Sequence, residues 1–298
     1  MSCEARGTRG VPGVAGSFPP FAGRSFLRRA RRHGWTRRAD GDRPRVAYFV
    51  DSFANFNDPL IGEAVVSVLR HNGIEVFVPP KQRASGATPL AHGDVDLARD
   101  RAARNLRVFA DLAREGYTIV CAEPTSAVMF RQDYLHLIED PDARLVAAHT
   151  VELTTFLWQL HQQGQLKTNF RPLDVSLGHH VPCHVKALGH AAAGPGLLAL
   201  IPRLRVGTID VSCSGMAGTY GMKEESYATS LAAGAPMIRE MNRPRVLFGS
   251  TECSACRMQM EEGSGKRTLH PVQYLALAYG LLPEIMLLLE EPLRGWGP

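Results

Sequence analysis

An alternation of β-rich and helical segments begins at Arg45 and starts again after Arg171-Pro172. In the first half, short apolar runs alternate with amphipathic helical patterns, the runs at 45–50, 75–78 and 118–121 and the patterns at 59–71, 94–115 and 143–163. Strand–helix–strand order predicts a parallel sheet with helices on both of its faces. The restart predicts a second unit of the same kind.

A shift of 129 residues superimposes landmarks of the two halves. It matches three of them without a gap: Val175 on Val46, Ser214-Gly215 on Ser85-Gly86, and Glu252 on Glu123. Three matches at one offset indicate an internal duplication. We therefore expect an α/β protein of two tandem homologous lobes, at 45–171 and 172–298. Each lobe is expected to be a small parallel sheet flanked by helices, with a pseudo-two-fold axis relating the two.

Positive charge is concentrated at the beginning of the chain. The formal net charge is +5, yet residues 1–45 hold eleven arginines and three acidic residues, which leaves about −3 for the rest. The folded part is therefore not expected to bind nucleic acid. Residues 1–44 are rich in Gly, Pro and Arg and are expected to form a basic, disordered leader or linker. An arm for nucleic acid or anionic lipid and an organelle transit peptide are the alternatives.

The sequence holds no run of the roughly 20 apolar residues that a membrane span needs. The most apolar stretch, 274–289, is interrupted by Gly280, Pro283 and Glu284. The unevenly spread cysteines are also unlike the framework of a small secreted domain. These features predict a cytoplasmic protein, with peripheral attachment to the inner face of the membrane as an option.

Four of the six cysteines lie in the second half: Cys183, Cys213, Cys253 and Cys256. Each follows an apolar run, and the carboxyl ends of parallel strands share one edge of a sheet. The four thiols are therefore expected to meet there. Four thiolates suit an iron–sulfur cluster or a tetrahedral zinc. Cys3 lies in the leader and Cys121 ends a strand pattern, so neither is expected to be a ligand.

The 129-residue shift places every one of these four cysteines on a non-ligand residue, so the first lobe is expected to be a scaffold. The long gaps between the cysteines and the lack of a His-x-x-His pattern favour iron–sulfur over zinc. Buried thiols, a zinc-stabilised interaction module and a thiol–disulfide pair at Cys253/Cys256 are the alternatives.

Several neighbours of the cysteines are candidates for tuning such a centre. Ser214 and Gly215 lie on a glycine-rich turn whose backbone N–H groups can approach bound sulfur closely. His180 and His184 flank Cys183 and could hydrogen-bond the centre or carry a proton, although ordinary strand-end hydrogen bonding explains them equally well. No residue is expected to act on a substrate.

Three runs make the chain resemble a known family: His180–His184 (HVPCH), Cys213–Gly221 (CSGMAGTYG) and Thr251–Cys256 (TECSAC). They resemble the cysteine-rich CCG domain of the heterodisulfide reductase B subunit, the anaerobic glycerol-3-phosphate dehydrogenase C subunit, and the iron–sulfur subunits of glycolate and D-lactate oxidases. The resemblance spans about 45–289. It is closest to the C-terminal part of fusions in which a flavin oxidase domain and a ferredoxin-like domain precede the two lobes.

The resemblance implies the iron–sulfur component of an oxidoreductase. Its expected role is to relay electrons from a flavin dehydrogenase, acting on a 2-hydroxy acid (lactate or glycolate) or glycerol 3-phosphate, to a downstream acceptor. FAD and the ferredoxin-like unit are expected on a partner chain or a missing upstream domain, because this sequence has neither fingerprint. A membrane-associated, quinone-linked acceptor is one option.

One departure from the family pattern concerns the cluster type. The paired Cys-Cys-Gly of the family appears here as Cys213-Ser214-Gly215. Four thiols remain where the noncubane cluster of the heterodisulfide reductases has five, which argues against that cluster and against disulfide reduction. Four thiols suit an ordinary [4Fe–4S] cluster, bound by the four second-half cysteines.

Overall fold

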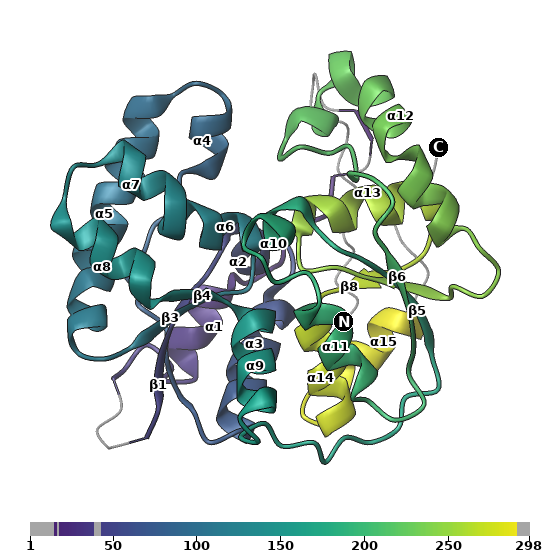
Figure 1. Cartoon of the computed structure of the whole chain (residues 1–298), viewed down its shortest axis with the longest axis horizontal. Helices are drawn as coiled ribbons and strands as arrows, with labels where there is room; N and C mark the ends of the chain where they lie inside the picture. Colours follow the sequence, from purple (N-terminus) through teal and green to yellow (C-terminus); the bar gives the residue numbers. More distant parts are fainter. Residues whose placement is uncertain (1–14, 17, 39–42, 291–298) are drawn as a thin grey trace.

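The chain folds into two α/β lobes, each built on a four-stranded parallel sheet (Figure 1). The computed structural model describes residues 15, 16, 18–38 and 43–290. The strands of the first sheet are β1 (Arg45–Phe49), β2 (Glu75–Phe77), β3 (Thr118–Cys121) and β4 (Thr150–Glu152). Those of the second sheet are β5 (Ser176–His180), β6 (Arg205–Ile209), β7 (Phe248–Ser250) and β8 (Thr268–Leu269). The predicted fold class of two tandem lobes is confirmed.

The two sheets have the same strand order. It runs β2-β1-β3-β4 in the first sheet and β6-β5-β7-β8 in the second, and every pair is parallel. In both sheets the connections leave in opposite directions from the two central strands. Such a switch point leaves a crevice outside the carboxyl ends of those strands, where α/β proteins bind ligands.

Helices cover both sheets. The first lobe contains α2 (Ser52–Phe56), α3 (Pro59–His71), α4 (Ala87–Ala91), α5 (Val95–Arg114), α6 (Pro124–Val128), the short π-helix η1 (Met129–Asp133), α7 (Tyr134–Leu137), α8 (Pro141–His149) and α9 (Leu153–Gln162). The second contains α10 (Cys183–Ala187), α11 (Ala193–Ala199), the 3₁₀ turn η2 (Tyr220–Met222), α12 (Glu224–Met241), α13 (Ser254–Ser264), α14 (Pro271–Tyr279) and α15 (Glu284–Glu290). Within the described ranges, no helix has the length and hydropathy that a bilayer crossing requires.

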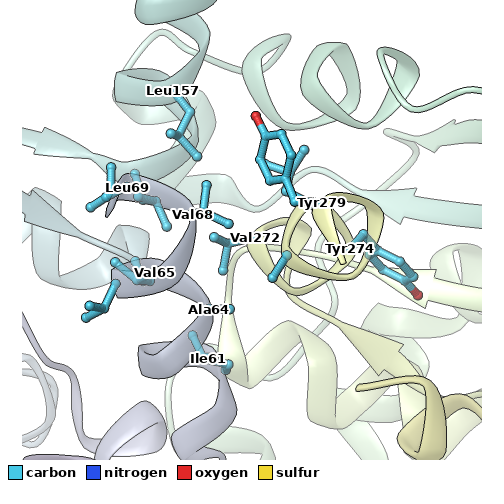
Figure 2. Close-up of a cluster of buried hydrophobic side chains, with 14 of the residues drawn as sticks. Ile61, Ala64, Val65, Val68, Leu69, Leu157, Val272, Tyr274 and Tyr279 are labelled. Atoms are coloured by element: carbon cyan, nitrogen blue, oxygen red, sulfur yellow. The ribbon is translucent and has the colours of Figure 1, made fainter. Parts of the chain in front are cut away.

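The lobes pack through equivalent helices in a reciprocal manner. Helix α3, between the first two strands of its lobe, packs on α14, which follows the last strand of the other lobe. Helix α11, the counterpart of α3, packs in turn on α9, the counterpart of α14. Two such equivalent contacts, α3 on α14 and α11 on α9, are what a pseudo-two-fold axis between the lobes produces. Figure 2 shows the contact, with apolar side chains of α3 and α9 facing those of α14. The buried core is continuous from one lobe to the other.

Helix α1 (Phe26–Arg32) departs from the expected disordered leader. Ser25 caps it by accepting the Arg28 N–H, and Phe26 and Ala30, one turn apart, are fully buried. The helix contacts α2 and α3, where Arg29 pairs with Glu63 at 2.9 Å. Burial of Phe26 and Ala30 against the first lobe orders this short basic segment, which the composition alone did not indicate. Residues 1–14 of the expected leader lie outside the described residues.

A second departure concerns the single helix predicted at 143–163. The chain instead forms α8, then the three-residue strand β4, then α9. Glu152 ends the strand and accepts the N–H groups of Thr154 and Thr155, so it starts a new helix. Strand β4 pairs with β3 from Ile119 to Cys121, and this pairing sets its conformation.

Candidate metal centre

The four candidate cysteines lie at the carboxyl edge of the second sheet. Cys183 begins α10 just after β5, Cys213 lies in the loop after β6, and Cys253 and Cys256 open α13 after β7. Partial desolvation raises the pKa of the Cys183 thiol, and the neighbouring thiols of Cys256 and Cys213 raise it further. The fold therefore brings these sulfur atoms into one neighbourhood.

Cys253 and Cys256 form the buried side of the site. Their residues are 8% and 5% exposed. The hydrogen bond from the Cys253 thiol lowers the pKa of Cys256 well below its usual range, and His180 and Ser214 also contribute. As the donor of that bond, Cys253 has its pKa raised. These contacts favour the thiolate form of Cys256, which is the form that binds metal.

The loop of Cys213 depends on the backbone of Gly215. The Gly215 N–H donates to the Cys213 Sγ at 3.3 Å, as expected of an amide that supports a metal-bound sulfur. Gly215 has φ +87°, and a Cβ there would lie 2.0 Å from the Ser230 carbonyl oxygen. The equivalent turn of the first lobe has Gly86 at φ +92°. The positive φ and the lack of room for a Cβ together restrict position 215 to glycine.

The other side of the site faces outward. Cys183 and Cys213 are exposed, in contrast to the buried pair. Val211, which is 55% exposed, and Tyr220, which is 45% exposed, are apolar side chains on the same loop as Cys213. A centre bound by these four cysteines would have one buried face and one face open to a partner.

The two predicted tuning histidines have different surroundings. His180 is buried and hydrogen-bonds Cys256, whereas the Nδ1 of His184 lies 2.9 Å from the Thr125 Oγ1 of the first lobe. His184 therefore contacts the other lobe.

Beside the cysteines lie a buried histidine, His179, and a buried acid, Glu252, which the sequence analysis used only as a landmark of the repeat. The Nε2 of His179 is 3.5 Å from the Oε1 of Glu252. Burial lowers the pKa of His179 to about 3, with His180 and His270 adding to the effect. Burial also raises the pKa of Glu252 well above its usual range, so burial favours the neutral form of both side chains.

The first lobe has carboxylates at the sheet edge where the second has cysteines. Asp51 caps α2, Glu123 caps α6, and both accept N–H groups of their own helices. The corresponding helices α10 and α13 begin at Cys183 and just after Cys253, and neither has a side-chain cap from its own N-cap residue. N-terminal N–H groups of helices beside the cysteines favour a negatively charged group at this edge.

This comparison corrects the fixed offset of 129 residues. Glu123 and Cys253 hold the same position, immediately before the helix that follows the third strand, so the shift there is 130. At Gly86 and Gly215 it is 129. Loop lengths differ by a residue between the lobes, which a single ungapped shift cannot represent.

The donor set fits a cluster better than a single zinc ion. Among the residues with described positions, no three His, Cys, Asp or Glu side chains converge as a single-ion site would need. Tetrahedral zinc at a Zn–S distance of about 2.3 Å requires its sulfurs about 3.8 Å apart. In an iron–sulfur cluster each thiolate binds a different iron, so the sulfurs are spread more widely. Four thiols at one sheet edge, without a tight group of three, are a donor set that such a cluster can use.

Comparisons with known proteins agree with this chemistry. Residues 177–261 match the family model of the cysteine-rich domain CCG. The C subunit of the anaerobic glycerol-3-phosphate dehydrogenase of Escherichia coli K12 is 31% identical over 235 residues, which cover 78% of this chain and 59% of that protein. Lactate utilization protein A of an Exiguobacterium species is 26% identical, over 79% of this chain and 96% of the relative.

A third relative is the B subunit of the fumarate reductase (CoM/CoB) of Methanothermobacter marburgensis, 26% identical over 78% of this chain and 44% of its own length. The chain thus spans about three fifths of the glycerol-3-phosphate dehydrogenase subunit and less than half of the fumarate reductase subunit. Residues 177–261 form a CCG-family cysteine-rich domain, and the chain belongs to the group of proteins that carry it.

Proposed function

We propose that this chain is an iron–sulfur electron-transfer subunit, with one [4Fe–4S] cluster held by Cys183, Cys213, Cys253 and Cys256. The observation that carries the proposal is the position of all four cysteines at one sheet edge, after β5, β6 and β7. When bound, such a cluster supplies one-electron transfer. Relatives that include a protein named as an iron–sulfur protein support the same chemistry.

The surrounding residues have separate tasks in this proposal. His180 and Ser214 hydrogen-bond Cys256 and favour its charged form, while the Gly215 N–H donates a hydrogen bond to the Cys213 sulfur. Donors to ligand sulfur tune the potential of such centres. The burial of Cys253 and Cys256 excludes water from one side. Electrons would pass at the exposed side, between Cys183 and Cys213.

The partner is proposed from the names of the relatives. Two of them are named for glycerol 3-phosphate and for lactate, which supports a flavin dehydrogenase for glycerol 3-phosphate or a 2-hydroxy acid as the electron donor. FAD and a ferredoxin-like unit would belong to that donor. We propose a cytoplasmic location, with a quinone-linked acceptor at the inner face of the membrane.

The test is the iron and acid-labile sulfide content of anaerobically reconstituted protein, together with its absorption spectrum. We expect about four of each per chain and a brown colour that dithionite bleaches. Cys253→Ala should lose most of the iron and the visible absorption. Cys121→Ala is the matched control, because Cys121 is fully buried in the first lobe, and it should keep both. Bound zinc without sulfide would contradict the proposal.

A further inference from the structure

Glu123 of the first lobe reaches the helix that carries two of the candidate ligands. Its residue is 8% exposed, and its Oε2 accepts both the N–H of Ser254 at 2.8 Å and the Oγ–H of Ser254 at 2.7 Å. Ser254 is the first residue of α13 and directly follows Cys253. A carboxylate from one lobe therefore caps the cysteine-bearing helix of the other.

The second oxygen of Glu123 leads to the other cysteine-bearing helix. Its Oε1 accepts the Thr125 Oγ–H at 3.0 Å, and the Thr125 Oγ1 is 2.9 Å from the Nδ1 of His184. A hydroxyl has one proton, which Thr125 gives to Glu123, so Thr125 accepts from a His184 that is protonated at Nδ1. His184 follows Cys183 in the first turn of α10. The bonds run without a break from Ser254 through Glu123 and Thr125 to His184.

Ordinary helix capping does not account for this arrangement. Glu152 has the same position one strand further along, where it is 1% exposed and caps α9. Both of its oxygens accept from Thr154 and Thr155 of its own helix. Glu123 uses only one oxygen within its lobe and gives the other to α13. The acid that stands in the place of Cys253 thus bonds across the lobe interface.

We infer that Glu123 and Thr125 are positioning residues of the first lobe, which fix α10 and α13 relative to one another and so set the separation of Cys183 from Cys253. Neither residue is one of the proposed ligands. The inference rests on the proposed function in one respect, because the separation of these cysteines matters only if a cluster binds both. The bridge, meaning the hydrogen bonds from Ser254 through Glu123 and Thr125 to His184, can be tested on protein without a cluster. It also gives the lobe that lacks the four cysteines a direct part in the site.

The first measurement is amide hydrogen exchange of cluster-free protein. In Glu123→Gln an amide nitrogen replaces one acceptor oxygen, so the bridge loses its Ser254 side or its Thr125 side. Hydrogen bonds to a charged group are strong enough that we expect exchange at 254–257 or 184–187 to rise about tenfold, relative to the amides of β3. Glu152→Gln is the matched control and should leave that ratio unchanged. An unchanged ratio in Glu123→Gln would overturn the inference.

The second measurement uses reconstituted protein. Loss of a residue that supports a metal ligand typically weakens metal binding about 10- to 100-fold, so iron release from Glu123→Gln to a chelator should be at least about tenfold faster than from wild type. Its electron paramagnetic resonance spectrum after reduction should also change, which a loss of stability alone would not cause. The inference would be overturned if Glu123→Gln kept the wild-type rate of iron release and the wild-type spectrum while Glu152→Gln released iron faster.

The two measurements separate the bridge from the proposed function. Wild-type protein that takes up no iron under reconstitution would refute the electron-transfer proposal, while the exchange data would still decide whether Glu123 ties the two helices together. A further check is Ser254→Ala, which removes one donor to Glu123. Its effect on exchange at 254–257 should be non-additive with Glu123→Gln and additive with Glu152→Gln.

Discussion

Single acidic residues account for much of the difference between the lobes. Asp51 and Glu123 cap helices at the edge where the second sheet presents cysteines, and each satisfies backbone N–H groups that would otherwise be left open. Burial, with the adjacent Glu123 carboxylate, raises the pKa of Asp51 to about 7. The first lobe thus places carboxylates at the sheet edge that carries the four candidate cysteines in the second.

The raised pKa of Asp51 predicts a pH dependence of stability. Between about pH 4 and 7 the unfolded chain ionises Asp51 whereas the folded protein keeps it protonated, so its contribution to stability is present at low pH and is lost as the pH rises. An asparagine at this position would cap α2 without ionising. We expect the free energy of unfolding of Asp51→Asn, relative to wild type, to gain up to about 1.4 kcal/mol per pH unit over this range. Urea denaturation at about pH 5, 6 and 7 measures it, and parallel curves would count against the raised pKa.

At the scale of elements, the turn after β6 offers a comparison of two glycines. Gly215 and Gly218 have φ of +87° and +69°, so alanine at either position costs about 1–2 kcal/mol from the backbone alone. Only at Gly215 would the new Cβ meet an atom, the Ser230 oxygen at 2.0 Å, whereas Gly218 faces open space. Overpacking of this kind typically adds about 1–3 kcal/mol. We expect Gly215→Ala to lower the thermal unfolding midpoint clearly more than Gly218→Ala does, and equal losses would show that the turn relaxes freely.

The elements that the sequence predicted are those with strong local signals. Helix α3 has the predicted bounds because Asp58 caps it, Pro59 occupies its first turn and Asn72-Gly73 ends it. Strands β4 and β8 were not predicted, since their three and two residues are too short for an alternating pattern and are set by pairing with β3 and β7. Tertiary contact, not local sequence, defines these edge strands.

The distinction between local sequence signals and tertiary contacts also applies to the candidate site. The position of all four cysteines after strands predicted one shared edge, because parallel topology alone brings strand ends together. The contact of Glu123 with Ser254 joins residues 131 positions apart and exists only because the lobes dock. The Glu123-Pro124-Thr125 run gives a capping signal, but it does not reveal which second helix the carboxylate reaches.

For the whole molecule, stability is distributed unevenly between the faces of the two sheets. One core extends from the first lobe through α3, α9, α11 and α14 into the second. The first lobe has its own outer core, rich in aromatic side chains such as Phe49, Phe109 and Phe130. The outer face of the second lobe buries a cluster of five residues, three of them Met. The second lobe therefore depends strongly on its contact with the first.

This dependence predicts that the two lobes unfold together. Val272 of α14 is fully buried and faces Val68 of α3 across the interface (Figure 2). Val272→Ala removes two methyl groups there and should cost about 2 kcal/mol. Because the core is shared, the slowest-exchanging amides of β1 and of β5 should both exchange about 30-fold faster, even though β1 belongs to the other lobe. Val211→Ala, at an exposed valine of the second lobe, should change neither set. Faster exchange confined to β5 would mean that the lobes open independently and that the interface contributes little to the stability of the first lobe.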